Sequence, residues 1–173
     1  MKRTLLTLCV ASLVSLGAIA QKVQKSPAST LKQTVGTTDV TVVYHRPGLK
    51  GRSLESLAPN GKVWRTGANE ATELTFSKDV TIGGNKLAAG TYSLYTIPGD
   101  SEWTIIINSK LSWGTQYSKD SDVARFAAKA SKASDSTETF TIDVSDISEN
   151  GKNANLELRW GTAVVKVPFE VSF

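Results

Sequence analysis

Apolar residues recur at every second position in short segments of the chain, which is the period of a β-strand with one buried face. Val40, Val42 and Tyr44 show this alternation. The clearest prediction is a hairpin over residues 91–108, where two alternating stretches flank the turn residues Pro98-Gly99-Asp100. The pattern predicts an all-β domain, a single antiparallel β-sandwich or barrel-like sandwich of about nine to ten short strands.

Other segments follow the same pattern, with Gly, Asn and Asp turns between them. A first hairpin is predicted over residues 29–44, and a short helical turn around Leu54 and Leu57. Further strands are predicted at 63–65, 71–76, 80–82, 139–144, 156–160 and 164–171, and an ordered loop at 110–122. Residues 123–133 are ambiguous. Their alanines favour a helix, but no apolar stripe at helical spacing appears, so an extended edge strand is the preferred interpretation.

The first twenty residues have the pattern of a cleaved signal peptide. Lys2 and Arg3 precede a short apolar run, and Ala18-Ile19-Ala20 resembles a cleavage site, so Gln21 is predicted to begin the mature chain. The apolar run is shorter than the roughly 20 residues that span a bilayer, and no transmembrane segment is predicted. We therefore expect an exported protein, periplasmic or secreted, with an N-terminal arm at 21–28 and one β-sandwich domain at 29–173.

Cleavage changes the charge and the cysteine count. The 20 basic residues fall to 18 because Lys2 and Arg3 are removed, and the 16 acidic residues stay, which leaves a net charge of +2. A nearly neutral domain argues against nucleic acid as a partner, since such binding needs a strong basic surface. Cys9, the single cysteine of the sequence, is also removed, so the mature domain is predicted to rely on its core rather than on disulfides.

Directional polar groups concentrate in residues 44–52 and 63–72. The candidate ligand-binding residues of these stretches are Arg46, Arg52, Trp64, Arg65, Asn69 and Glu70. Arginine grips carboxylates and phosphates through paired hydrogen bonds, and an aromatic ring beside it suits a sugar or a small anion. The sequence therefore predicts a possible site for a small anionic or sugar ligand.

Three functional hypotheses follow for this cluster. The leading one is an exported, non-catalytic binding or envelope-associated module. The second is a hydrolase acting on glycans or other envelope polymers, with Glu70 as general acid or base and Glu73, Asp79 or Asp39 as a second carboxylate. The third is a purely structural domain, in which Arg65 and Arg52 neutralise Glu70 and Glu55 and hold the long loop in place.

Metal and cofactor sites are not predicted. Metal sites gather several His, Cys or carboxylate ligands at fixed spacing, whereas the mature chain has one histidine, His45, and no cysteine. Ligand identity, strand order and oligomeric state stay open at this level.

Several of the same stretches resemble a known family. They are Arg46-Pro47, Lys50-Gly51-Arg52, the run Val63-Trp64-Arg65-Thr66-Gly67-Ala68-Asn69-Glu70-Ala71-Thr72 and Ala89-Gly90-Thr91-Tyr92-Ser93-Leu94. With Ile97-Pro98 and Trp103, they resemble an uncharacterised exported bacterial family (domain of unknown function 2911) over nearly the whole mature chain. The resemblance implies export in Gram-negative bacteria and a shared site, and it supplies no reaction.

Overall fold

The structure is a computed structural model that describes residues 23–173. The predicted signal peptide at 1–20 and the start of the predicted arm lie outside the described residues. Within the described part, strands dominate and the one α-helix is a single turn, α1 (Leu54–Leu57), as predicted.

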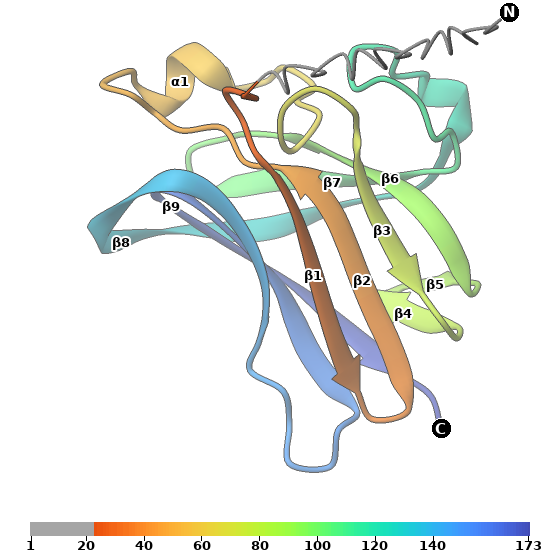
Figure 1. Cartoon of the computed structure of the whole chain (residues 1–173). Helices are drawn as coiled ribbons and strands as arrows, with labels where there is room; N and C mark the ends of the chain where they lie inside the picture. The colour runs from red at the N-terminus through yellow and green to blue at the C-terminus, as the bar shows by residue number, and fades with distance from the viewer. Residues whose placement is uncertain (1–22) are drawn as a thin grey trace, which may run out of the picture.

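Nine antiparallel strands form the domain. They are β1 (Ala28–Val35), β2 (Thr38–His45), β3 (Thr72–Phe76), β4 (Val80–Ile82), β5 (Asn85–Leu87), β6 (Gly90–Ile97), β7 (Glu102–Asn108), β8 (Asp122–Ser145) and β9 (Asn153–Val171). Their order across the sheet is β1-β2-β3-β6-β7-β8-β9-β4-β5. The sheet folds over on itself into two layers, so the predicted all-β sandwich is confirmed (Figure 1).

β8 belongs to both layers. Its first part, to Lys129, pairs with β7, and its later part, from Ala130, pairs with β9. Register shifts between Lys132 and Thr137 and between Thr137 and Thr141 bend the strand where it changes layer. The prediction of an extended strand at 123–133 is thus confirmed. Residues up to Lys129 pair with β7 alone, so this part of β8 is the last strand of the first layer, as an edge strand is.

Two predicted breaks between strands were also wrong, because β8 and β9 continue beyond the segments in which apolar and polar residues alternate. Residues 139–144 are the end of β8 rather than a separate strand, and 156–160 and 164–171 are both parts of β9. Conversely, residues 63–65 form no strand and make only an isolated bridge between Trp64 and Thr96. The predicted loop at 110–122 contains a 3-10 turn, Lys119–Ser121, and β5 was not predicted.

Alternating side chains fill the space between the layers. Val42, Leu74, Leu94, Ile105 and Ile107 on the first layer are fully buried. They face buried residues of the second layer, which include Ile142, Leu156, Leu158, Val165, Val167 and Phe169. Burying apolar surface at about 25 cal/mol per Å² makes this core the main source of stability in a domain that has no disulfide to add.

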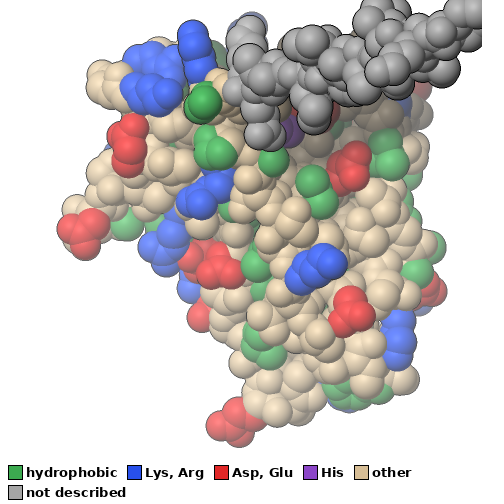
Figure 2. Space-filling model, in the orientation of Figure 1, with side chains coloured by type: hydrophobic (Ala, Val, Ile, Leu, Met, Phe, Trp, Pro, Cys, Tyr) green, Lys and Arg blue, Asp and Glu red, His purple; other side chains and the backbone are tan. Residues whose placement is uncertain are grey.

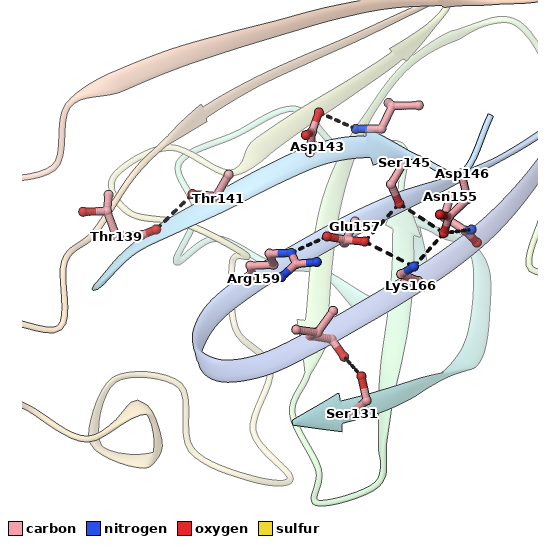
Figure 3. A network of polar contacts seen from close by, with 12 residues as sticks. Ser131, Thr139, Thr141, Asp143, Ser145, Asp146, Asn155, Glu157, Arg159 and Lys166 are labelled. Carbon is pink, nitrogen blue, oxygen red and sulfur yellow. Dashed lines mark hydrogen bonds and ion pairs between the residues drawn. The ribbon is translucent and has the colours of Figure 1, made fainter. Parts of the chain in front are cut away.

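A polar network covers part of the second layer (Figure 3). Glu157 on β9, only 6% exposed, is paired with Arg159 and accepts a hydrogen bond from Ser145 Oγ at 3.0 Å. Lys166 Nζ lies 2.6 Å from Asp146 Oδ2 and 3.6 Å from Glu157 Oε2. Burial opposes ionisation of Glu157, yet the hydrogen bonds from Arg159 and Ser145 hold its pKa below the ordinary value.

Candidate functional site

A basic pocket lies at the end of the sandwich where α1 is found. Lys and Arg side chains gather on this end in Figure 2, and the turn between β1 and β2 lies at the other end with the C-terminus (Figure 1). The pocket has a volume of about 550 Å³, within the range of small-molecule sites. Its lining comprises Lys25, Ser26, Pro47, Gly48, Lys50, Arg52, Leu57, Trp64, Arg65, Gly67, Ala68 and Trp160.

The four cations of the pocket have no acidic partner in the described chain. Among residues 23–173, no carboxylate lies within ion-pair distance of Lys25, Lys50, Arg52 or Arg65. Glu138 comes near, but its Oε1 accepts from the main-chain N of Lys50 at 2.6 Å rather than from the ammonium group. The pocket therefore gathers four cations that form no ion pair in residues 23–173, with the single carboxylate of Glu138 beside it.

Both arginines of the pocket are held in place by main-chain carbonyls. Arg52 donates from Nε to Leu49 O and from Nη2 to Gly48 O, each at 3.0 Å. Arg65 donates from Nη1 to Asn69 O at 3.2 Å. A carbonyl orients a guanidinium without neutralising it, so each arginine keeps its full charge and several free N–H donors.

The predicted internal ion-pair network is therefore wrong in its pairings. Glu70 Oε2 lies 3.2 Å from Nδ1 of His45, not beside Arg65. Glu55 accepts from the main-chain N of Asn60 at 3.1 Å, not from Arg52. The acidic groups that were expected to neutralise the arginines are engaged elsewhere.

Trp64 forms the inner wall of the pocket and belongs to the core at the same time. Its ring stacks on Trp160 with centroids 5.3 Å apart and an interplanar angle of 18°, and it meets Phe140 edge-on at 4.9 Å. Main-chain hydrogen bonds of 2.7 and 2.9 Å tie it to Thr96 on β6. Because Trp64 is only 7% exposed, it offers a ligand little of its ring surface.

The turn after Trp64 has an unusual backbone. Thr66 and Asn69 have φ angles of 53° and 60°, in the left-handed region that a β-branched residue such as Thr rarely adopts. Thr66 is fully buried, with Oγ1 3.1 Å from Thr96 Oγ1, and its carbonyl accepts from Thr72 Oγ1 at 2.6 Å. These contacts hold a strained turn that carries Gly67 and Ala68 to the pocket wall.

Arg46, also a predicted ligand residue, is a structural tie. It donates from Nε to Phe140 O at 3.0 Å and from Nη2 to Thr141 Oγ1 at 2.8 Å. The following residues continue this attachment, since Leu49 N donates to Glu138 O at 2.9 Å. Arg46 thus anchors the long loop on β8 and does not line the pocket.

Asn69 and Glu70 stand outside the pocket. Asn69 contributes its carbonyl to Arg65 and to the N–H of Gly114, and Glu70 forms an isolated bridge with Trp113. For the hydrolase hypothesis, Glu70 needs a second carboxylate at about 5 to 10 Å. Asp39 is the second residue of β2 and Asp79 follows β3, so both lie at the strand ends that are far from Glu70. Of the three predicted partners, only Glu73, the second residue of β3, lies near the same strand end as Glu70.

The structure adds residues that sequence reasoning had not assigned to the site. Lys25 comes from the arm, Lys50 from the loop after β2, and Trp160 from β9. Lys50 lies within residues 44–52, one of the two polar stretches identified in the sequence, so the sequence already pointed to its neighbourhood. Nothing in the local sequence marks Lys25 or Trp160, because only the fold brings them there.

Other possible sites in residues 23–173 are weaker. No group of three or more His, Cys, Asp or Glu residues in this part of the chain is placed to hold a metal ion. No helix that the structure describes is long and apolar enough to cross a membrane. A larger cavity of about 750 Å³ lies near the C-terminus, but it mixes Lys86 and Lys152 with Asp79 and Glu170.

Comparison with known proteins places the chain in a family. A family model described as "Protein of unknown function (DUF2911)" matches residues 26–169, which include every strand up to most of β9. No curated protein and no solved structure matches the chain. The matched segment covers well over half of the sequence, and the chain therefore belongs to the DUF2911 family of proteins of unknown function.

Proposed function

We propose that this domain is a non-catalytic binding module that takes a small anionic ligand into the basic pocket. The observation that carries the proposal is the set of four cations, Lys25, Lys50, Arg52 and Arg65, without an acidic partner among the described residues. Like charges gathered in a concave site repel one another. A bound anion relieves that repulsion and accepts the free N–H donors.

The shape of the pocket favours an anionic group attached to a small organic body. Leu57, Trp64 and Trp160 add apolar residues to the lining beside its cations. A carboxylated or phosphorylated sugar, or a short organic acid, has both kinds of surface. A neutral sugar lacks the charge and binds more weakly.

The proposed setting is outside the cytoplasm. The signal-peptide pattern of residues 1–20 supports export, and cleavage before Gln21 leaves the arm that supplies Lys25. N-terminal sequencing of protein recovered from the periplasm or the medium tests this. A mature chain that starts at Met1 contradicts it.

Calorimetric titration of the mature chain tests the binding function. The ligands are phosphate, short carboxylates, sugar acids, sugar phosphates and the matching neutral sugars. We expect the anionic members to bind, with an affinity that falls as salt screens the pocket, and the neutral counterparts to bind more weakly. Lys50→Glu reverses one pocket charge without removing an Arg52 hydrogen bond and is expected to weaken binding about tenfold or more.

Lys32→Glu is the matched control, because it changes the net charge equally and Lys32 is an exposed cation on β1 that does not line the pocket. Equal affinities of the wild type and Lys50→Glu would contradict the proposed site. Equal loss in Lys50→Glu and Lys32→Glu would reveal only a general effect of net charge and would also contradict it.

A further inference from the structure

Two large apolar side chains are exposed at the end of the sandwich that holds the basic pocket. Leu111 and Trp113, on the segment between β7 and β8, are 49% and 48% exposed. This segment and α1 lie at the same end of the molecule (Figure 1). The other three tryptophans, Trp64, Trp103 and Trp160, are buried. An exposed tryptophan next to a second exposed apolar residue marks this end as a candidate interaction surface.

Main-chain contacts place Trp113 beside the wall of the pocket. Asn69 O accepts a hydrogen bond from Gly114 N at 3.2 Å and another from Arg65 Nη1 at 3.2 Å. Arg65 lines the pocket, and its side chain packs so closely against Gly114 that no room is left for a Cβ there. The residue that follows Trp113 therefore touches one of the four pocket cations.

The local backbone turns both apolar side chains outward. Ser112, which stands between them, faces inward: its O accepts from Ala71 N at 3.3 Å, and its Oγ is shielded from solvent. The segment is extended here, since Trp113 forms a bridge with Glu70, and successive side chains of an extended segment point to opposite sides. Leu111 and Trp113 thus project together from the outer side of the segment.

The charges around this apolar pair suit an anionic partner. Lys110 is exposed and, like the four pocket cations, forms no ion pair among residues 23–173. Two acids lie close by. Glu70 Oε2 is 3.2 Å from Nδ1 of His45, and Glu138 accepts from a main-chain N–H of the pocket lining. The exposed apolar pair therefore lies between Lys110 and the pocket cations.

A small soluble anion matches only half of this surface, because it enters the pocket and leaves Leu111 and Trp113 in water. A bilayer of anionic phospholipid matches both halves. Its phosphate groups attract cations, and the boundary between headgroups and acyl chains takes up apolar side chains. Tryptophan is favoured at that boundary because its ring is apolar while its N–H is polar.

We propose that this end of the domain docks on a membrane surface that contains anionic phospholipid. The basic pocket takes the phosphate group of one lipid, and Leu111 and Trp113 enter the boundary between headgroups and acyl chains beside it. The proposal rests on the proposed function of the pocket, and it names the class of ligand. It also gives a role to two exposed side chains that a soluble ligand does not use.

Co-sedimentation of the mature chain with vesicles tests the docking. One set of vesicles is phosphatidylcholine alone, and the other is phosphatidylcholine mixed with phosphatidylglycerol. We expect binding to the mixed vesicles, with an affinity that falls as salt rises, and much weaker binding to phosphatidylcholine. Lys50→Glu is expected to weaken binding about tenfold, and Lys32→Glu, outside the pocket, by less than about threefold. Equal loss in the two variants overturns docking through the pocket.

Tryptophan fluorescence reports the apolar contact directly. Because Trp113 is the exposed tryptophan, its entry into the membrane boundary is expected to shift the emission to shorter wavelengths. Trp113→Ala is expected to lose this shift and to bind mixed vesicles about fivefold more weakly. The matched control is Ile147→Ala, because Ile147 is 42% exposed between β8 and β9, in a turn whose Gly151 lies against Gly36 at the other end. Bound wild type without a shift overturns the docking.

Calorimetry with glycerol phosphate separates the docking from the function of the pocket. This compound carries the phosphate of the lipid without its acyl chains. Binding of glycerol phosphate without binding of mixed vesicles overturns the docking and leaves the pocket function in place. Failure of both, together with the other soluble anions, overturns the pocket function and the docking with it.

Discussion

Tyr44 on β2 reaches across to β8 and bonds both main-chain groups of Ile142. Its Oη accepts from Ile142 N at 3.0 Å and lies 3.4 Å from Ile142 O. The contact is buried, and it joins residues 98 positions apart in the chain. One hydroxyl thus connects the two layers at a point where their strands do not pair.

Tyr44→Phe is expected to lower the free energy of unfolding by about 1 to 3 kcal/mol, because it leaves the Ile142 N–H buried without an acceptor. Urea unfolding followed by tryptophan fluorescence measures the change. Tyr92→Phe, whose hydroxyl is exposed, is expected to cost much less. Equal costs for the two variants would show that the contact with Ile142 adds nothing to stability.

Arg46→Ala is expected to destabilise the domain without weakening ligand binding. It removes the hydrogen bonds to Phe140 O and Thr141 Oγ1, at a cost of about 1 to 3 kcal/mol. The pocket keeps its four cations, so the dissociation constant of an anionic ligand is expected to change less than twofold. Titration of the folded variant checks this, and a large loss of affinity would place Arg46 in the site after all.

Gly114→Ala is expected to weaken ligand binding through Arg65. A Cβ at this position meets Arg65 Cδ at 2.3 Å and the main-chain Asn69 O at 2.8 Å, so both must shift, at a cost of about 1 to 3 kcal/mol. Gly84→Ala is the comparison, because its Cβ meets nothing within 4 Å and only its φ of 79° opposes the change. Calorimetry is expected to show lower affinity for Gly114→Ala alone.

Low pH is expected to weaken the polar network around Glu157 and Lys166 on the second layer. The pKa of Glu157 is held below its ordinary value, chiefly by Arg159 and Ser145 against the effect of burial, and that of Asp146 is lowered by Lys166. A lowered folded-state pKa gives stability that is fully present above the unfolded-state pKa. That stability is lost as the pH falls toward and through the pKa of the folded state, which for Glu157 means below about pH 4.5.

Glu157→Gln is the variant that checks this pH dependence. We expect it to lower the free energy of unfolding by about 1 to 2 kcal/mol at pH 7, and the difference from the wild type to shrink below pH 4. Unfolding by urea at several pH values gives both quantities. A difference that grows toward low pH would reverse the sign and contradict the account.

The hairpins were predictable because their signals are local. β1 with β2, and β6 with β7, each combine alternating side chains with a turn that glycine or proline marks. The length of β8 was not predictable in this way. Its middle, around Ser131 to Ser136, is exposed and polar, and its pairing jumps by several residues there, so the alternation that signals a strand is lost.

Only part of the candidate site was predictable from the sequence. Arg52, Trp64 and Arg65 were identified and do meet in one pocket. The partners of Arg46 and Glu70 could not be identified, because Phe140 is 94 positions from Arg46 and the distance between His45 and Glu70 depends on a strained turn. Sequence shows which groups are available, and long-range packing decides which of them remain unpaired.

The sharing of β8 between the layers bears on how the chain folds. The first layer ends on the beginning of β8, and the second layer is built from its remainder and from β9, the last strand of the domain. A chain that emerges from its N-terminus can therefore pair the strands of the first layer once Lys129 is free, but it cannot bury the core face of that layer until β9 has also emerged. We expect folding to be slow, as in other proteins dominated by distant contacts. Unfolding should occur in a single cooperative step, without a stable half-domain.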